Sequence, residues 1–169
     1  ASGKTLYEAA WDYFVPALYD SGFGYSLVAD DTAALWWAEA PYKISRRCPA
    51  PEGRASLRIH AARGEYEPFQ LVLAPKKDLK NLRVEITPLR SEDDARIPAS
   101  AIEVCRVGYV TITHPTDEIG CAGDWPDPLP PLDGPIDVTA ADGNQPLWIT
   151  VHVPHEARPG EYTGMIRLL

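Results

Sequence analysis

The sequence predicts an all-β fold, an antiparallel β-sandwich of the immunoglobulin-like or galactose-binding-like kind, with a short N-terminal helix. Two observations carry this prediction. Apolar and polar residues alternate in several short segments, as is typical of half-buried strands. The 17 prolines among 169 residues, about twice the usual share of ~5%, fall largely between those segments. Long helices are therefore not expected to dominate.

The alternating segments define the expected strands. In the clearest of them, residues 146–153, four apolar side chains share one face: Leu147, Ile149, Val151 and Val153. Shorter alternations occur at residues 56–60, 82–86 and 102–107. The nearly continuous apolar run at 67–73 is expected of a central strand. Before the last strand, Tyr162 is expected to bond its hydroxyl back across a corner, as in other sandwiches.

The chain divides into two unequal parts. Residues 5–20 have helical spacing that Pro16 interrupts, which predicts a short helix within an N-terminal extension, residues 1–32. Residues 33–169 form the predicted sandwich domain. The stretch from 115 to 145 is expected to be an ordered loop stiffened by prolines. The last residues still read as a strand, so we expect this chain to be a piece of a longer protein.

The acidic composition argues against several partners. A formal net charge of −8 disfavours nucleic acid and anionic membranes, because both require a basic surface. No apolar stretch approaches the ~18 residues that a membrane-spanning helix needs. Dinucleotide and phosphate-loop fingerprints do not occur in the sequence, and no cofactor is expected.

Asp124 and Asp127 lie three residues apart in the segment DWPDP, with Asp117 and Glu118 nearby. Two carboxylates about 5–9.5 Å apart are the catalytic pair of glycosidases, and clustered carboxylates can also hold calcium. Aspartates beside prolines more often initiate and cap turns, and this is the interpretation that we favour. A self-sufficient hydrolase built on Asp124 and Asp127 is the least favoured hypothesis.

Four tryptophans are candidates for contact with a carbohydrate or with another domain. Trp36 and Trp37 are adjacent, so on a strand they face opposite sides, and one of them can be exposed for sugar stacking. We favour burial of both, one within the sandwich and one under the N-terminal helix. Trp148 faces away from the apolar side of its strand, and Trp125 is an apolar anchor in the proline-rich stretch.

The cysteines and histidines do not predict a metal site. Cys48, Cys105 and Cys121 lack the spacing of zinc ligands, and both one disulfide with a free thiol and three buried thiols remain open. His152 and His155 can meet near a strand end, but no third ligand is near them in the sequence.

Six segments, in this order, resemble the N-terminal β-sandwich domain that precedes the catalytic barrel in glycoside hydrolase family 123 and its uncharacterised relatives. They are LWWAEAPYKISR (35–46), AARGEYEPFQLVL (61–73), YVTITHPTD (109–117), GDWPDPLPP (123–131), NQPLWITVHVP (144–154) and RPGEYTGMI (158–166). The resemblance covers residues 33–169. The family pattern often has Asn where this chain has Gly64.

The resemblance implies β-N-acetylgalactosaminidase chemistry for the parent protein, assisted by the substrate's own acetamido group. The acidic catalytic residues of the family sit in the barrel, so no catalytic residue is carried over to this chain. A secreted, periplasmic or cell-surface bacterial protein is also implied, with the signal peptide missing from this sequence.

Two functions are therefore predicted. The preferred one is a non-catalytic domain that packs against the downstream barrel through residues 114–135, centred on Trp125 with Asp117, Glu118, Asp124 and Asp127 as a polar rim. In the alternative, Trp125 has a structural role within the domain and folds back as a lid over one end of the sandwich. The second function is a carbohydrate-binding module that uses Trp36 or Trp37, Trp125 and Trp148 as stacking platforms for a glycan.

Overall fold

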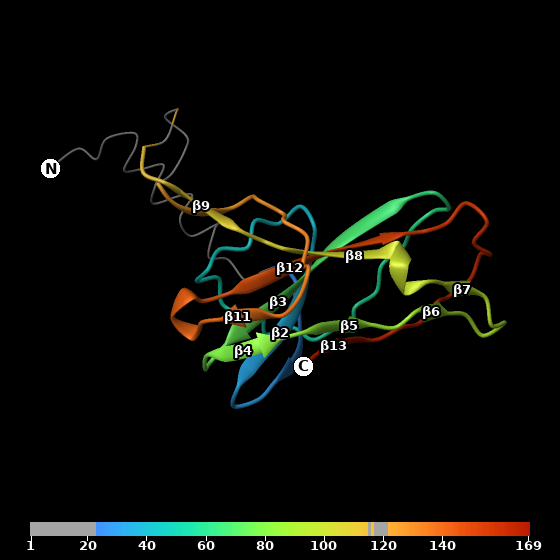
Figure 1. Ribbon diagram of the computed structural model, residues 1–169, viewed down its shortest axis with the longest axis horizontal. Coiled ribbons are helices and arrows are strands. Elements are labelled where there is room, and N and C mark those ends of the chain that lie inside the picture. The colour runs from blue at the N-terminus through green and yellow to red at the C-terminus, as the bar shows by residue number, and fades with distance from the viewer. Residues whose placement is uncertain (1–22, 115, 117–121) are drawn as a thin grey trace, which may run out of the picture.

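The computed structural model describes residues 23–114, 116 and 122–169, and within them the chain forms an antiparallel β-sandwich (Figure 1). One layer is a five-stranded sheet. Its strands lie in the order β1 (Tyr25–Ala29), β2 (Ala33–Glu39), β3 (Tyr66–Pro75), β12 (Gln145–His152) and β8 (Ile102–Arg106). The predicted all-β class is confirmed. The helix predicted at residues 5–20 lies outside the described residues.

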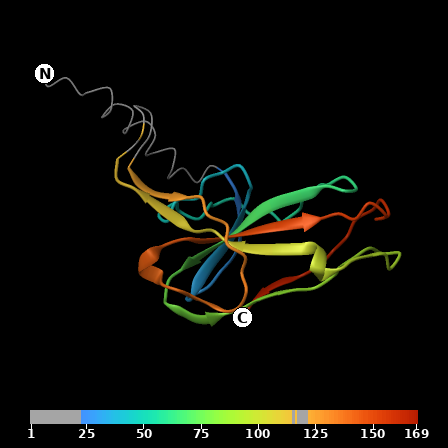
Figure 2. The same ribbon diagram turned by 45° about the horizontal axis from the view of Figure 1, so that its top comes forward.

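The second layer is built from short strand pairs that run along one face of this sheet (Figures 1 and 2). They are β4 (Leu79–Leu82) with β11 (Ile136–Val138), β5 (Val84–Ile86) with β13 (Ile166–Leu168), and β6 (Leu89–Arg90) with β7 (Arg96–Ile97). Short 3-10 turns lie at Ala99–Ala101 and Ala140–Asp142. A fourth pair, β9 (Tyr109–Ile112) with β10 (Gly123–Pro126), forms a hairpin that projects from one end of the sandwich (Figure 1).

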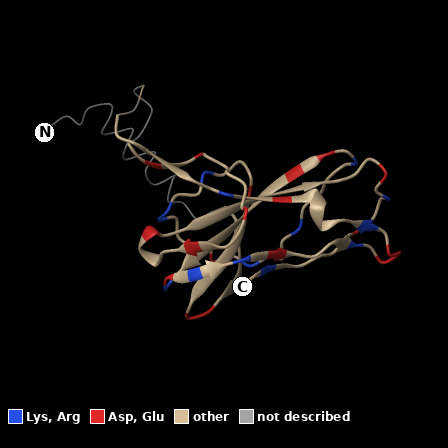
Figure 3. Ribbon diagram, viewed as in Figure 1, with Lys and Arg blue, Asp and Glu red and all other residues tan. Residues whose placement is uncertain are grey.

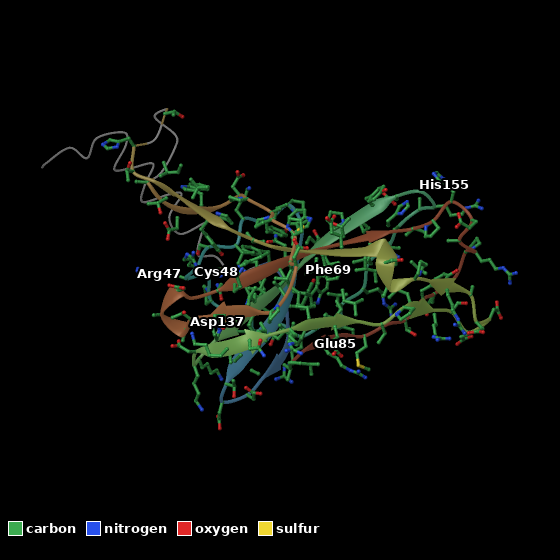
Figure 4. The ribbon with its side chains drawn as sticks, in the orientation of Figure 1. Arg47, Cys48, Phe69, Glu85, Asp137 and His155 are labelled. Carbon is green, nitrogen blue, oxygen red and sulfur yellow. The ribbon has the colours of Figure 1, made fainter. Side chains whose placement is uncertain are left out.

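The core lies between the two layers, and the predicted register of β12 is confirmed. Ile149 and Val151 belong to the central apolar cluster together with Phe69, and Leu147 is equally buried. Val153 packs against the same cluster, whereas Trp148, Thr150 and His152 on the other face of the strand are only half-buried. Figure 4 shows the labelled Phe69 in the middle of the molecule. Because side chains alternate along a strand, one choice of register decides the whole buried face.

Three local predictions need correction. Residues 56–60 are not a strand: Leu57 and Ile59 do pack against the core, but the segment pairs with no neighbouring strand among the described residues. The main sheet begins with β1 at Tyr25, inside the segment predicted to be an N-terminal extension. The stretch from 115 to 145 is not one long loop, because its described part contains β10, β11 and a 3-10 turn.

The proline-rich segment after β10 covers the open edge of the main sheet. The backbone N–H groups of Arg106 and Gly108 donate to the carbonyl oxygens of Pro130 (3.0 Å) and Pro128 (2.7 Å), and Leu132 donates to Val104 (2.9 Å). Proline accepts hydrogen bonds but has no N–H group to offer a further strand. The segment therefore provides hydrogen-bond partners for the backbone groups at the edge of β8. Because its prolines have no N–H groups, it is a poor template for the addition of a strand from another chain.

A second apolar cluster lies on the outer face of the main sheet. It contains Trp36, Ala38, Ile44, Cys48 and Val72, and the irregular segment at residues 40–50 covers it. β2 and β3 are thus buried on both faces where they cross the middle of the sheet. This explains why the sequence of β3 is nearly continuously apolar.

Buried amide side chains attach that irregular segment to the sheet. Gln70 Nε2 donates to the carbonyl oxygen of Tyr42 at 2.7 Å and to that of Ala40 at 3.2 Å. Asn144 Nδ2 donates to the carbonyl oxygens of Ser45 (3.0 Å) and Cys48 (2.6 Å). The carbonyl groups of a covering loop need such partners, because leaving them buried and unpaired is costly.

Two turns agree with the sequence. Tyr162 Oη donates to the carbonyl oxygen of Arg158 at 2.9 Å, which confirms the predicted corner bond. Gly64 has a φ of +79°, and a Cβ there would lie 2.3 Å from a ring atom of His155. The left-handed φ favours glycine or asparagine, and the close approach of the His155 ring favours glycine at this position of this chain.

Charged side chains of both signs are interspersed over the surface (Figure 3). The ion pairs of Arg96 with Asp94 (3.2 Å) and of Lys80 with Asp137 (2.9 Å) are exposed. The backbone N–H of Asn81 and the ammonium of Lys80 hold the pKa of Asp137 below its usual value. No helix in the described part of the chain is long and apolar enough to cross a membrane.

We expect Val151→Ala to lower the free energy of unfolding by about 1–3 kcal/mol, through lost burial and the cavity left behind. Urea unfolding followed by tryptophan fluorescence measures the loss. Thr150→Ala is the matched control, because Thr150 lies on the half-buried outer face of the same strand. A larger loss for Thr150→Ala than for Val151→Ala would contradict the register.

Candidate functional site

The predicted acidic residues lie where the β9–β10 hairpin meets residues 43–46. Tyr109 Oη donates to the carbonyl oxygen of Ile44 at 2.9 Å. The guanidinium of Arg46 lies 4.1 Å from the centre of the Tyr109 ring and 3.4 Å from Asp124 Oδ2. Thr111 Oγ1 completes the contact by donating to Asp124 Oδ1 at 2.6 Å.

Asp127 is neutralised separately from Asp124. Lys43 Nζ lies 3.6 Å from Asp127 Oδ1 and also donates to the carbonyl oxygen of Pro126 at 3.1 Å. Each aspartate thus has its own cation, in an arrangement that cross-links the hairpin to the segment beside it. Asp117 and Glu118, predicted to belong to the same rim, lie outside the described residues.

Burial raises the pKa of the Tyr109 hydroxyl far above its usual value, while Arg46 acts in the opposite direction. The hydroxyl therefore stays protonated at physiological pH and serves as a donor to Ile44. It does not serve as a base. The chemistry of this cluster is that of attachment: hydrogen bonds, a cation–π contact and two ion pairs hold the hairpin in place.

The hairpin has two different faces. The antiparallel register pairs Thr111 with Asp124 and Val110 with Trp125, so these two pairs lie on opposite faces. The face of Thr111 and Asp124 is polar and contacts Arg46. The face of Val110 and Trp125 is apolar and points away from that contact, and Val110 exposes 41% of its surface.

The tryptophans are placed differently from one another. Trp37 lies in the central core and Trp36 in the outer cluster, so both are buried. The expected position of one of them under the N-terminal helix involves residues outside the described part of the chain. Trp36 is completely inaccessible and lies against Phe23, at 6.4 Å between ring centres. Neither ring offers a face for stacking on a sugar. Trp125 and Trp148 are half-buried, the first on the hairpin and the second on the outer face of β12.

The cysteines and histidines serve the fold in the described part of the chain. Cys105 is a buried free thiol, and burial raises its pKa, assisted by nearby Glu103 and Asp133. Cys48 is buried in the outer cluster, and Cys121 lies outside the described residues. His152 stacks on Tyr66, with ring centres 4.2 Å apart. Among the described residues no group of three or more metal-ligating side chains comes together.

Comparison with known proteins now identifies the family. The glycoside hydrolase 123 N-terminal domain matches residues 37–169. The chain belongs to this family. The predicted resemblance is confirmed, and the match extends over the main sheet from β2, the hairpin and the second layer.

Among solved structures, the chain is similar to a family 123 glycoside hydrolase from Clostridium perfringens, studied for glycolipid glycan hydrolysis. The two are 18% identical with a TM-score of 0.49, and the match covers 64% of this chain and 19% of that one. The chain thus corresponds to about a fifth of the length of that enzyme. Among curated proteins none matches significantly.

Sequence reasoning missed the cations and the amides that organise this region. A signal for Gln70 was present, because it is the one polar side chain inside the apolar run at 69–73. Lys43, Arg46 and Tyr109 carried no such signal. They are far from Asp124 and Asp127 in the sequence. Lysine, arginine and tyrosine are also common surface residues, so their presence alone does not indicate a site.

We expect Tyr109→Phe to lower the free energy of unfolding by about 0.5–1.5 kcal/mol, because it removes one partly buried hydrogen bond to Ile44. The matched control is Tyr42→Phe: Tyr42 is 40% exposed and stacks on Phe23, and its hydroxyl has no hydrogen-bond partner within the described residues. Chemical unfolding of both variants tests this. Equal losses would show that the hairpin attachment does not depend on the Tyr109 hydroxyl.

Proposed function

We propose that this chain is a non-catalytic accessory domain that packs against a downstream catalytic domain of the same polypeptide. The observation that carries the proposal is the family match, which is to an N-terminal domain and covers residues 37–169. The geometry supports it, because Asp124 and Asp127 are each bound to a cation and hold a hairpin in place.

The docking surface of the proposed function is the apolar face of the β9–β10 hairpin. The polar face of the hairpin is used inside the domain, in the contacts of Tyr109 and Asp124. The opposite face carries Val110 and Trp125, and a tryptophan surrounded by polar groups is the usual centre of an interface. A rigid attachment lowers the entropy that is lost on docking.

Hydrolysis of N-acetylgalactosaminides is proposed for the parent protein alone. The secreted or periplasmic location expected from the resemblance stays a prediction. The second candidate, a carbohydrate-binding module, loses two of its platforms because Trp36 and Trp37 are buried. Trp125 and Trp148 remain on separate parts of the molecule, the hairpin and β12.

The chain by itself is expected to show no turnover of a nitrophenyl N-acetylhexosaminide, since its two candidate acids are engaged as structural ion pairs. Release of nitrophenol after rigorous purification is the measurement. Turnover that Asp127→Asn abolishes would overturn the proposal. Asp137→Asn is the control, because Asp137 is also ion-paired but lies in the second layer.

We expect Val110→Asp to change the unfolding free energy of the isolated chain by no more than about 0.5 kcal/mol, as at other exposed sites. In the longer parent, the same change is expected to remove roughly 2 kcal/mol of coupling between the domains, as at an interface hot spot. Thermal and urea unfolding of both proteins measure the difference.

Val28→Asp is the matched control, because Val28 is 56% exposed and lies on β1, away from the hairpin. It should leave the coupling unchanged. Trp125→Ala extends the test to the neighbouring residue. Equal losses in the isolated chain and in the parent would mean that Trp125 serves the sandwich itself, as a lid over its end.

A further inference from the structure

Residues 56–61, the open segment, have the side-chain pattern of a strand but no neighbouring strand. Leu57 and Ile59 pack against the central cluster, and the even-numbered residues from 54 to 60 are exposed. Such alternation is typical of a strand with one buried face. Within the described residues, however, no backbone N–H or C=O group of the open segment takes part in a hydrogen bond. Its backbone is therefore free to pair with another chain.

Both ends of the open segment are fixed to the rest of the domain. Before it, Trp37 Nε1 donates to the carbonyl oxygen of Ala55 at 3.2 Å. After it, the backbone N–H of Gly64 donates to the carbonyl oxygen of Val153 at 2.7 Å. A backbone that is already held in place loses little conformational freedom when a partner pairs with it.

A groove of about 440 Å³ lies where the open segment approaches the ends of β2 and β3. The segment contributes Arg58, Ile59 and His60 to its lining, and the two strands contribute Glu39 and Glu67 among others. The β2–β3 ladder ends at the pair of Glu39 with Phe69, so no strand of the main sheet fills this space. The groove therefore gives room for a further backbone beside the open segment.

The open segment and its flanks are basic, although the chain as a whole is acidic. Residues 53–64 include Arg54, Arg58 and Arg63 and no acid, while the formal net charge of the chain is −8. All three arginines are exposed, and none makes an ion pair with the described residues. Arg54 and Arg58 share the exposed face, because every second residue of a strand points the same way.

We propose that the open segment binds an extended acidic peptide by strand addition. The backbone of the peptide pairs with residues 56–61, as in other complexes that extend a sheet edge. Its carboxylates lie opposite Arg54 and Arg58, where cross-strand side chains are close enough to interact. Glu39 and Glu67 repel any carboxylate that faces the groove, so the acids of the peptide alternate with uncharged residues. This inference goes beyond the proposed docking role and does not depend on it.

A second copy of this chain is a poorer occupant than an acidic peptide. The open segment has no carboxylate, so two such segments gain no ion pair, and pairing them in register sets Arg58 against Arg58. Like charges directly opposite each other on neighbouring strands are destabilising. An anion without a peptide backbone engages the arginines but leaves the N–H and C=O groups of the segment unpaired.

The test is a titration of the ¹⁵N-labelled chain with the acetylated and amidated peptide TDVDVDT at millimolar concentration. We expect saturable shifts in the amide spectrum at residues 56–61. We also expect slower hydrogen exchange at alternate amides of the segment, because successive N–H groups of a strand point to opposite edges. The control peptides are TKVKVKT, with the opposite charge, and TDDDVVT, with the composition of the probe but adjacent acids. Both should bind several-fold more weakly.

Arg54→Ala and Arg58→Ala should each weaken binding of the probe about two- to fivefold, and together about tenfold, as expected for exposed charge pairs. Arg47→Ala is the matched control and should bind the probe as the unchanged chain does. Arg47 is also exposed, but it lies in the segment that covers the outer cluster (Figure 4). The amide spectrum shows whether each variant is folded, and Arg58→Gln replaces Arg58→Ala if that variant is not.

The proposal is overturned if TDVDVDT does not shift residues 56–61, if either control peptide binds as tightly, or if binding survives the double substitution. Tripolyphosphate is the probe for an anion without a backbone. If it binds as tightly as the peptide, and the peptide slows no amide exchange, the segment is an anion-binding patch only and strand addition is wrong. Self-association of the chain through residues 56–61 would assign the segment to a second copy instead. A negative result for Val110→Asp would affect only the docking role.

Discussion

Buried amide side chains are the constraint on which the rest of this structure depends. Gln70 and Asn144 reach from the central strands to carbonyl groups of residues 39–48, and Gln145 does the same for Val107. A buried carbonyl without a partner is costly, so these bonds decide where the irregular chain lies. Because they place residues 40–50 over Trp36, they also position Lys43 and Arg46 beside the hairpin.

The same arrangement explains how the domain divides its surface. On one side of the outer cluster, Lys43 and Arg46 neutralise Asp127 and Asp124, and the β9–β10 hairpin is attached by its polar face. On the other side the chain leaves β2 at Glu39, and Glu39, Glu67 and Arg58 lie together beside β3. The hairpin side is the surface that we propose for a neighbouring domain.

Much of the fold could be predicted because it depends on local periodicity. The alternation at 147–153 predicted the buried face of β12, and the run at 67–73 predicted a central strand, since both patterns follow from side-chain direction. The same reasoning was wrong about pairing at 56–60, where Leu57 and Ile59 face the core but the backbone finds no strand. An alternating pattern indicates which side chains of a segment are buried. It does not indicate whether another strand forms hydrogen bonds with the backbone of that segment.

The sequence by itself determined the class of the fold, the core face of β12, the corner at Tyr162 and the family. Those properties depend on the spacing of apolar and turn residues within short segments, or on the order of the family's sequence motifs along the chain. Only the tertiary structure decided that Asp124 meets Arg46, that Asp127 meets Lys43, and that Glu39 and Glu67 share a groove. These partners are far apart in the chain. Their encounter depends on strand order and on where β2 ends, and no local pattern of residues encodes either.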